Sequence, residues 1–415
     1  MGLIYQTIAT AANIMFINMG MPNKNAVLWS SLLGWPYIAK FLWAPILELY
    51  KTKKFFVVLM QIVLPVLLVG AALCLRLPSG GWMTPVLLFI GLTALAGATQ
   101  DIGTDGVYVT TLNPKNQARY TAFQSMCWNL GPIVATGPLV GLSGLVYKWT
   151  GKWDLAWMVV LLATAGITLI MGVYHFFMLP TGTKAPGSPA SLGEAMHTFG
   201  RAFATFFDKK GIVPMIAFAL FYRSAYGMME KMGPVFMINP RSAGGLGLSN
   251  EIFSTIYGTG GTLAFIVGSL LGGLTVARYG LKRSILVLCL CLNVPNITFL
   301  YLSQTMPMSL TVVTAVVLVE KLAWGFGAVA HMLYMMQQIA PGPYQTAHYS
   351  IATGLMGLCM IGVGILSGVI QEAVGFKVFF VIALAAMIPS ILVTLLAPFH
   401  VEDVTKKGPS TESAG

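Results

Sequence analysis

The chain has 415 residues, of which 56% are hydrophobic and 9% are charged, with a mean hydropathy of +0.78. Average soluble domains carry about 25% charged residues, so this composition excludes a water-soluble fold and indicates a chain solvated by lipid. The formal net charge is +11, but the basic residues lie in short segments between apolar runs, where orientation signals occur. This pattern excludes nucleic acid as a partner.

The apolar runs predict transmembrane helices. They are roughly 20 residues long, enough to cross a bilayer as a helix, and they do not alternate as the strands of a membrane barrel do. We predict an all-α membrane protein of about twelve transmembrane helices, in which the apolar start is the first helix and not a cleaved signal peptide. In chain order the predicted spans are 2–19, 26–46, 54–75, 84–111, 119–147, 154–179, 211–238, 251–276, 284–303, 310–339, 346–374 and 377–398.

The first of these spans is short. Residues 2–19 are at the low end of the ~17–25 residues that cross a bilayer. A helix beginning there would leave its first N–H groups without partners at membrane depth. We therefore expect that the first helix is truncated and that the natural protein extends further upstream. The alternative is a short helix that borders an aqueous cavity.

Two segments of the chain recur with one offset. Ala44–Lys54 matches Gly273–Arg283, and Ala118–Thr121 matches Ala347–Ser350; residues 44 and 273, like residues 118 and 347, are 229 apart. The repeat predicts two pseudo-symmetric six-helix bundles, with a site between them as in secondary transporters. The predicted domains are an N-terminal bundle 1–180, a cytoplasmic linker 181–210, a C-terminal bundle 211–399 and a disordered cytoplasmic tail 400–415.

The linker begins with a Pro-, Gly- and Ser-rich stretch and ends in an amphipathic segment, 191–210. Its apolar residues recur at helical spacing and predict a helix on the membrane surface; the alternative is a loosely ordered loop. Fourteen Lys and Arg residues fall on the linker side of the predicted spans and six on the other side. By the positive-inside rule, both termini are expected in the cytoplasm.

The repeated basic turns resemble the G-x-x-x-D-R-x-G-R-R signature of the major facilitator superfamily, and the second copy is closer to it. In the first copy Glu48 takes the place of the Asp and Leu49 that of the Arg, and Ala277 replaces the Asp in the second. Lys40–Pro45 (K-F-L-W-A-P) and Ala98–Asp105 (A-T-Q-D-I-G-T-D) are similar to strings of the AmpG-type muropeptide permeases, in the peptide and acetyl-CoA transporter branch.

This resemblance covers the whole chain and implies a major facilitator fold. It also implies proton-driven import across the cytoplasmic (inner) membrane of a bacterium, with anhydro-sugar peptides as the family's best-known cargo. The chain departs from larger members in stopping after about twelve spans, where they carry two more. Relatives in the branch move siderophores or acetyl-CoA, so a transporter of either cargo is an alternative.

Charged residues inside the spans are the main functional signal, because each costs roughly 2.5–3.5 kcal/mol to insert. In the span 84–111, Asp101 and Asp105 lie one turn apart on a face that also carries Gln100. Such a pair can take and release a proton, and Gln100 can contact cargo. The alternative for Asp105 is a gate contact with Lys40 or Arg119.

The span 211–238 carries Arg223, Tyr226 and Glu230 on one stripe. Arg223 cannot lose its charge, and its planar fork suits a cargo carboxylate. We expect Arg223 and Tyr226 to bind substrate and Glu230 to take part in proton coupling. The alternative is a permanent salt bridge from Arg223 to Glu230 or to an acid on another helix.

The span 310–339 carries Glu320, Trp324, His331 and Tyr334 on one seam, which indicates a cavity face. Glu320 is a further candidate for proton coupling. His331, of a residue type that titrates near physiological pH, is a candidate for binding substrate. Trp324 and Tyr334 are expected to stack on sugar rings; packing is the alternative. Two other predicted spans carry uncharged polar residues on one face. These residues are candidates for hydrogen bonds to sugar hydroxyls or, as the alternative, for hydrogen bonds between helices: Gln6, Thr10, Asn13, Gln124 and Trp128.

The charged turns supply a predicted cytoplasmic gate, made of Lys40, Glu48, Arg119, Arg278 and Arg283. The five cysteines lie in apolar runs without metal-ligand spacing, and neither a nucleotide fingerprint nor a catalytic triad is present. We therefore predict no cofactor and no metal.

The sequence predicts a monomeric secondary transporter whose partners are a small-molecule cargo, protons and the lipid bilayer. The predicted activity is proton-coupled import of an anionic sugar-peptide by alternating access. A membrane-embedded acyltransferase is the alternative from another class. It would rely on His331 with Glu320, which lie roughly 16 Å apart along one helix, too far for a catalytic dyad.

Overall fold

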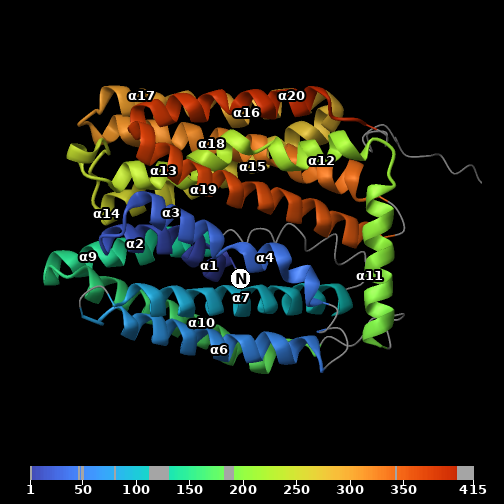
Figure 1. Ribbon diagram of the computed structural model, residues 1–415, viewed down its shortest axis with the longest axis horizontal. Coiled ribbons are helices and arrows are strands. Elements are labelled where there is room, and N and C mark those ends of the chain that lie inside the picture. Colours follow the sequence, from blue (N-terminus) through green and yellow to red (C-terminus); the bar gives the residue numbers. More distant parts are fainter. Residues whose placement is uncertain are drawn as a thin grey trace, which may run out of the picture. The chain divides into compact units, whose positions relative to one another are not determined.

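The computed structural model describes residues 2–44, 47, 51–78, 81–111, 130–181, 191–341 and 344–399. Over these residues the chain is helical and contains no strand (Figure 1), as the length of the apolar runs predicts. Nine helical runs in the described part are long and apolar enough to cross a membrane: Lys53–Cys74, Met83–Tyr108, Leu130–Thr150, Trp153–Met178, Ile212–Ile238, Asn250–Tyr279, Leu281–Thr305, Leu310–Ile339 and Ala347–Leu395.

Three features of the chain account for the difference between these nine runs and the predicted twelve spans. Ala347–Leu395 holds two predicted spans, because α19 (Gln345–Ala385) is broken at Gly375, where φ is 73°. The predicted span 2–19 is helical through α1 (Gly2–Gln6), η1 (Thr7–Ala11) and α2 (Ala12–Asn18), but it is short. The span 26–46 is divided among α3 (Asn23–Leu32), α4 (Trp35–Ala39) and η2 (Lys40–Leu42). The count of twelve stays a prediction.

The chain forms two compact units. Unit 1 comprises Met1–Gly200, Lys231–Thr262 and Gly364–Phe376, and unit 2 comprises Arg201–Glu230, Leu263–Val363 and Lys377–Gly415. The units do not follow the two halves of the sequence, because two segments of the second half pack with the first. The predicted boundaries at 180 and 211 stay a prediction.

Unit 1 is built around α6 (Lys53–Cys74), α7 (Met83–Thr111), α9 (Val140–Thr150) and α10 (Trp153–Met178), and α6 lies along both α7 and α10 (Figure 1). The helix α6 begins where Thr52 Oγ1 accepts the Phe55 N–H at 3.2 Å, a helix N-cap. One face of α6 buries Leu64 completely, while Val66 on another face is 65% exposed. Exposed aliphatic side chains of this kind are what a lipid environment solvates.

Unit 2 contains α12 (Ile212–Phe221), α15 (Thr262–Tyr279), α16 (Leu281–Asn293), α17 (Ile297–Thr305), α18 (Leu310–Tyr334), η7 (Met335–Ile339) and α20 (Met387–Leu395). Glycines bring α15 and α18 into backbone contact. A Cβ on Gly268 would lie 1.9 Å from the carbonyl oxygen of Leu322, and one on Gly325 would lie 1.9 Å from that of Phe265. Small residues at such crossings let membrane helices approach closely, so these two positions fix the distance between α15 and α18.

The predicted amphipathic helix of the linker is present as α11 (Leu192–Phe207). Its last turns pack within unit 2, where Phe206 is fully buried and His348 Nε2 lies 3.1 Å from the carbonyl oxygen of Ala202. After the helix, Lys209 Nζ donates to the carbonyl oxygens of Ile339 and Pro341, and burial lowers the pKa of Lys209. The end of α11 is therefore anchored to protein; its position on a membrane surface stays a prediction.

Candidate functional site

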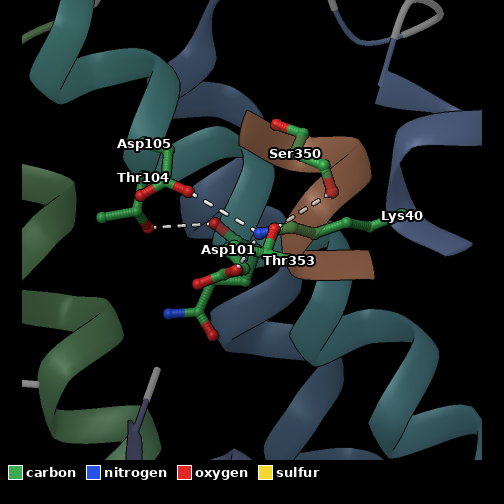
Figure 2. Close-up of polar contacts among 7 residues, drawn as sticks. Lys40, Asp101, Thr104, Asp105, Ser350 and Thr353 are labelled. Carbon is green, nitrogen blue, oxygen red and sulfur yellow. Dashed lines mark hydrogen bonds and ion pairs between the residues drawn. The ribbon is translucent and has the colours of Figure 1, made fainter. Parts of the chain in front are cut away.

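A cluster of one cation and two acids lies in unit 1. Lys40 Nζ, in η2, is 2.5 Å from Asp101 Oδ2 and 3.7 Å from Asp105 Oδ2, both on α7 (Figure 2). The side chain of Asp101 is 14% exposed and that of Asp105 is 52% exposed. Two carboxylates facing one ammonium leave one negative charge uncompensated, so the cluster can accept one proton. The ion pair between Lys40 and Asp105 is also what a gate role for Asp105 requires.

Three polar atoms, one each on α2, α4 and α7, lack protein partners among the described residues. Asn13 Oδ1, Tyr37 Oη and Gln100 Oε1 are buried and accept or donate no hydrogen bond among the described residues. By contrast, Gln6 Nε2 donates to Thr10 Oγ1 at 2.7 Å. Buried polar atoms normally have a partner, so Asn13, Tyr37 and Gln100 present hydrogen-bonding capacity for water or a ligand.

In unit 2 the helix that carries Arg223 is broken beside it. The helix α12 ends at Phe221 and α13 (Ser224–Ile238) begins at Ser224. Ser390 Oγ donates to the carbonyl oxygen of Tyr222 at 2.5 Å, and Ser224 Oγ donates to that of Ala386 at 2.9 Å. The first bond satisfies a carbonyl at this break, and the second satisfies one between α19 and α20. Broken helices near mid-membrane form the binding sites of many transporters.

Arg223 has no acidic partner in the described part of the chain. Its Nη2 donates to the carbonyl oxygen of Ala328 at 3.1 Å, its guanidinium carbon lies 5.6 Å from the centre of the Tyr226 ring, and its Nε has no hydrogen-bond partner there. The salt bridge to Glu230 that the sequence left open is therefore not formed. A guanidinium held within a span without a counter-ion is suited to an anionic ligand.

The aromatic and histidine side chains predicted on α18 have protein partners. Trp324 Nε1 donates to Asn296 Oδ1 at 2.8 Å, His331 Nε2 lies 3.1 Å from the carbonyl oxygen of Ala219, and Tyr334 Oη donates to that of Pro398 at 2.7 Å. All three are almost completely buried. These contacts account for the three side chains as packing groups, and their roles toward a cargo stay predictions.

Glu320, on the same seam, differs from its neighbours. It is fully buried, and neither carboxylate oxygen has a hydrogen-bond partner among the described residues. A buried carboxylate without hydrogen bonds is unfavourable, so packing alone does not account for this residue. Its predicted part in proton coupling stays a prediction.

Lys321 is a site residue that the sequence reasoning missed. Its Nζ lies 4.4 Å from the centre of the Trp324 ring, and the acids whose charges act on it are Glu320 and Glu230. The Trp324 ring is in turn 4.7 Å from that of Tyr226, at an interplanar angle of 70°. A lysine near the middle of an apolar span is a signal by itself, but it lies about 100° away from the Glu320 seam.

The remaining predicted residues are less informative. Arg278 and Arg283 are exposed at the turn between α15 and α16, and Arg278 lies over the ring of Tyr279. Their gate role stays a prediction. Four candidates lie outside the described residues: Glu48, Arg119, Gln124 and Trp128.

Within unit 1, side-chain contacts connect the two halves of the sequence. Asn18 Oδ1 accepts from Asn250 Nδ2 at 2.7 Å, and Asn250 Nδ2 also donates to Ser143 Oγ at 2.8 Å. Asn23 and Asn239 exchange reciprocal amide hydrogen bonds of 3.2 and 3.1 Å. We call these contacts and two ion pairs of 2.9 Å the inter-half network; the ion pairs are Lys24–Glu372 and Lys148–Glu251.

Two of the hydrogen bonds in the inter-half network involve asparagines at helix ends. Asn18 is the last residue of α2, in the first half of the sequence, and Asn239 directly follows α13, in the second half. Each of them bonds an asparagine of the other half, Asn250 and Asn23 respectively. Each of these two helix ends is therefore hydrogen-bonded to the other half of the sequence.

A cavity of about 560 Å³ lies beside this network in unit 1, with Leu139, Leu142 and Leu145 in its lining. Its walls are mostly apolar, and none of the predicted site residues lines it. The charged clusters, and not this cavity, are therefore the candidate site.

A bundle of transmembrane helices with charges near mid-span and a helix broken at one of them has the architecture of a secondary transporter. The family model described as Major Facilitator Superfamily matches residues 2–369. The chain belongs to that superfamily, as its basic turns predict, and it is a multi-pass membrane transporter and not an enzyme.

Among curated relatives, the anhydromuropeptide permease of Escherichia coli (strain K12) is 24% identical over 372 residues, which cover 88% of this chain and 71% of the relative. The putative transporter AmpG 3 of Rickettsia typhi is 22% identical and covers 84% of this chain and 82% of its own length.

Solved structures show the same fold. A D323A mutant of the nucleoside transporter NupG superposes with a TM-score of 0.68 at 16% identity, covering 95% of this chain and 96% of that one. A bacterial homolog to the human lysosomal transporter Spinster gives a TM-score of 0.68 at 14% identity, covering 95% and 93%.

Proposed function

We propose that this transporter imports an anionic sugar-peptide of the muropeptide type together with protons, by alternating access across the inner membrane of a bacterium. The cargo class is suggested by the relatives, of which one is named an anhydromuropeptide permease and others AmpG transporters. In this proposal the protein acts as a monomer with both termini in the cytoplasm, as the distribution of Lys and Arg favours.

Arg223 is the observation that carries the proposal. It lies near the middle of the run Ile212–Ile238, at the break between α12 and α13, and it makes no ion pair among the described residues. Its charge is permanent, so the empty transporter carries an uncompensated cation there. A cargo carboxylate would neutralise it through paired charge-assisted hydrogen bonds.

Proton coupling is assigned to the cluster of Lys40, Asp101 and Asp105. The two acids share one ammonium at 2.5 and 3.7 Å, so protonation of one acid leaves a neutral cluster with one ion pair. In a symporter this step would occur when cargo is bound. Glu230 and Glu320 are the other acids that stand as candidates, and Glu320 is the less accessible of them.

Alternating access requires contacts that form in one state and break in another. The inter-half network supplies such contacts, because it joins residues of both halves through hydrogen bonds and ion pairs. If Lys148→Cys and Glu251→Cys are joined by a short bifunctional thiol reagent, in a chain without its native cysteines, we expect uptake to stop. Cleavage of the reagent should restore uptake, and unchanged uptake in the joined protein would contradict this role.

The test of the proposed function is uptake by proteoliposomes that contain the purified protein. We expect a labelled disaccharide-tripeptide with a 1,6-anhydro sugar to accumulate when the lumen is alkaline relative to the medium, and a protonophore to abolish the accumulation. Unlabelled siderophores and acyl-CoA serve as competitors and should not reduce uptake. Uptake that is absent, or that a protonophore leaves unchanged, would overturn the proposal.

A further inference from the structure

We propose that Lys321 is a second cation of the cargo site, and that Arg223 and Lys321 together bind a cargo with two separate acidic groups. This inference rests on the proposed function and deepens it, because it specifies the charge of the cargo. It depends on a row of four side chains in unit 2, which we call the cation row: Arg223, Tyr226, Trp324 and Lys321.

The cation row is continuous. The Arg223 guanidinium carbon is 5.6 Å from the centre of the Tyr226 ring, the Tyr226 and Trp324 ring centres are 4.7 Å apart, and Lys321 Nζ is 4.4 Å from the Trp324 ring centre. Cations within about 6 Å of an aromatic face are attracted to it. The two rings therefore hold a positive charge at each end of the row and set the distance between the charges.

The two cations are the more exposed members of the cation row. Tyr226 is 8% exposed and Trp324 is 1% exposed, whereas Arg223 and Lys321 are both partly exposed. A hydrogen bond also holds the Trp324 ring in place, because its indole N–H donates to Asn296. The rings thus form a buried support, and the cations are the part of the row with accessible surface.

Both cations lie near the middle of their apolar runs, Ile212–Ile238 and Leu310–Ile339. Transporters place their binding sites at this depth. Glu230 and Glu320 are the acids that act on Lys321, so part of its charge is balanced in the empty protein, whereas Arg223 has no such acid among the described residues. We therefore expect the acidic group at Arg223 to contribute more to binding than the one at Lys321.

The test is a thermodynamic cycle on the purified protein, with binding measured by calorimetry. The ligands are the anhydro-disaccharide tripeptide and versions in which one carboxylate is a carboxamide. For one of these amides, we expect wild type to bind about tenfold more weakly than it binds the parent compound, and Lys321→Gln to bind both equally. Lys321→Arg should retain the difference, and Lys377→Gln, an exposed lysine outside the cation row, should behave as wild type.

A second measurement keeps the test independent of folding defects in Lys321→Gln. Lys321→Cys, in a chain without native cysteines, is treated with 2-aminoethyl methanethiosulfonate, which adds a side chain ending in an ammonium group. We expect this reagent to restore binding of the parent compound, and the neutral methyl methanethiosulfonate not to restore it.

An amidation penalty of equal size in wild type and Lys321→Gln for every amide, with no rescue by the cationic reagent, would overturn the inference and leave the proposed function standing. If wild type binds acyl-CoA or a siderophore but no muropeptide, the proposed function fails, and Lys321→Gln is compared with wild type on that anion. A tenfold loss would then support the inference, and no loss would overturn it. A wild-type protein that binds none of these anions contradicts both.

Discussion

Lys40 in unit 1 and Arg223 in unit 2 are held in opposite ways. Lys40 is neutralised within the protein, since its Nζ is 2.5 Å from Asp101 and 3.7 Å from Asp105. In unit 2 the cation Arg223 has no ion pair among the described residues, and the acid Glu320 has no hydrogen bond there. Both arrangements are costly to insert in a bilayer, so each is expected to have a use.

The difference indicates a division of labour after duplication. An acid paired with a lysine can exchange a proton without leaving a bare charge, because the lysine has a second acid within reach. An arginine without an acid cannot exchange a proton, but it can bind an anion. We therefore assign the proton to the cluster in unit 1 and the cargo to the cations of unit 2.

The largest effect is expected at Arg223. Arg223→Gln should weaken cargo binding by about 100-fold, which corresponds to the loss of charge-assisted hydrogen bonds worth about 3 kcal/mol. Arg223→Lys should fall between this variant and wild type, because lysine keeps the charge and loses the fork. Calorimetry on purified proteins measures the affinities, and Arg241→Gln, at an exposed arginine in the 3-10 helix η4 (Arg241–Ala243), is the control. Wild-type affinity in Arg223→Gln would remove Arg223 from the site.

The next effect is expected at Asp101. Asp101→Asn should abolish concentrative uptake while preserving exchange of labelled for unlabelled cargo, because an amide cannot take up a proton but leaves the cations of unit 2 in place. Both reactions are measured in proteoliposomes. Asp154→Asn is a matched control, since Asp154 also makes an ion pair, with Arg76 at 3.2 Å. Accumulation at the wild-type level by Asp101→Asn would exclude Asp101 as the proton carrier.

A smaller effect, on stability, is expected at Lys40. Lys40→Gln leaves two acids facing each other and should lower the free energy of unfolding by about 2–3 kcal/mol, less than for a fully buried pair because Lys40 is 31% exposed. The double variant Lys40→Gln/Asp101→Asn should recover most of this loss. Thermal unfolding in detergent measures both. If the double variant is no more stable than Lys40→Gln, the cluster is not held together by its charges.

The smallest effect is expected at Glu320. Neither carboxylate oxygen is hydrogen-bonded among the described residues, so Glu320→Gln removes no such bond and keeps the size of the side chain. We predict a thermal midpoint within about 2 °C of wild type and no loss of cargo affinity, since the change removes one of the acids that act on Lys321. A clear loss of concentrative uptake in this variant would instead move the proton from unit 1 to unit 2.

Much of the fold could be predicted from the sequence, because the length of each apolar run and the repeat at an offset of 229 residues are visible in the residues themselves. The break at Tyr222 and Arg223 could not be predicted in this way, since no Gly or Pro occurs there and the compensating hydroxyl comes from Ser390, far along the chain. The break at Gly375 did have a signal in the sequence, because glycine is the residue that favours a positive φ. The φ of Gly375 is 73°, and one helix ends there and the next begins.

The candidate site was predicted in part. Periodicity placed Asp101 and Asp105 on one face, and both contact Lys40. It also grouped Trp324 with Glu320, but it could not show that Trp324 bonds Asn296. Lys321 was missed because it directly follows Glu320. Residues that share a helix face with Glu320 are three or four positions away, so this criterion does not select the immediate neighbour of Glu320. Contacts across elements, such as Asn18 with Asn250, have no local signal at all.

The division between the units is tested most directly by counting protons when cargo binds. Purified protein in weakly buffered detergent solution is mixed with the anhydro-disaccharide tripeptide, and a pH-sensitive dye reports proton uptake per cargo bound. At a cargo concentration that just saturates wild type, we predict proton uptake by wild type and cargo binding without proton uptake by Asp101→Asn. Arg223→Gln, which binds cargo about 100-fold more weakly, should take up almost no protons, because cargo and proton sites are coupled reciprocally. Proton uptake at the wild-type level by Asp101→Asn, or cargo binding at wild-type affinity by Arg223→Gln, would contradict the account.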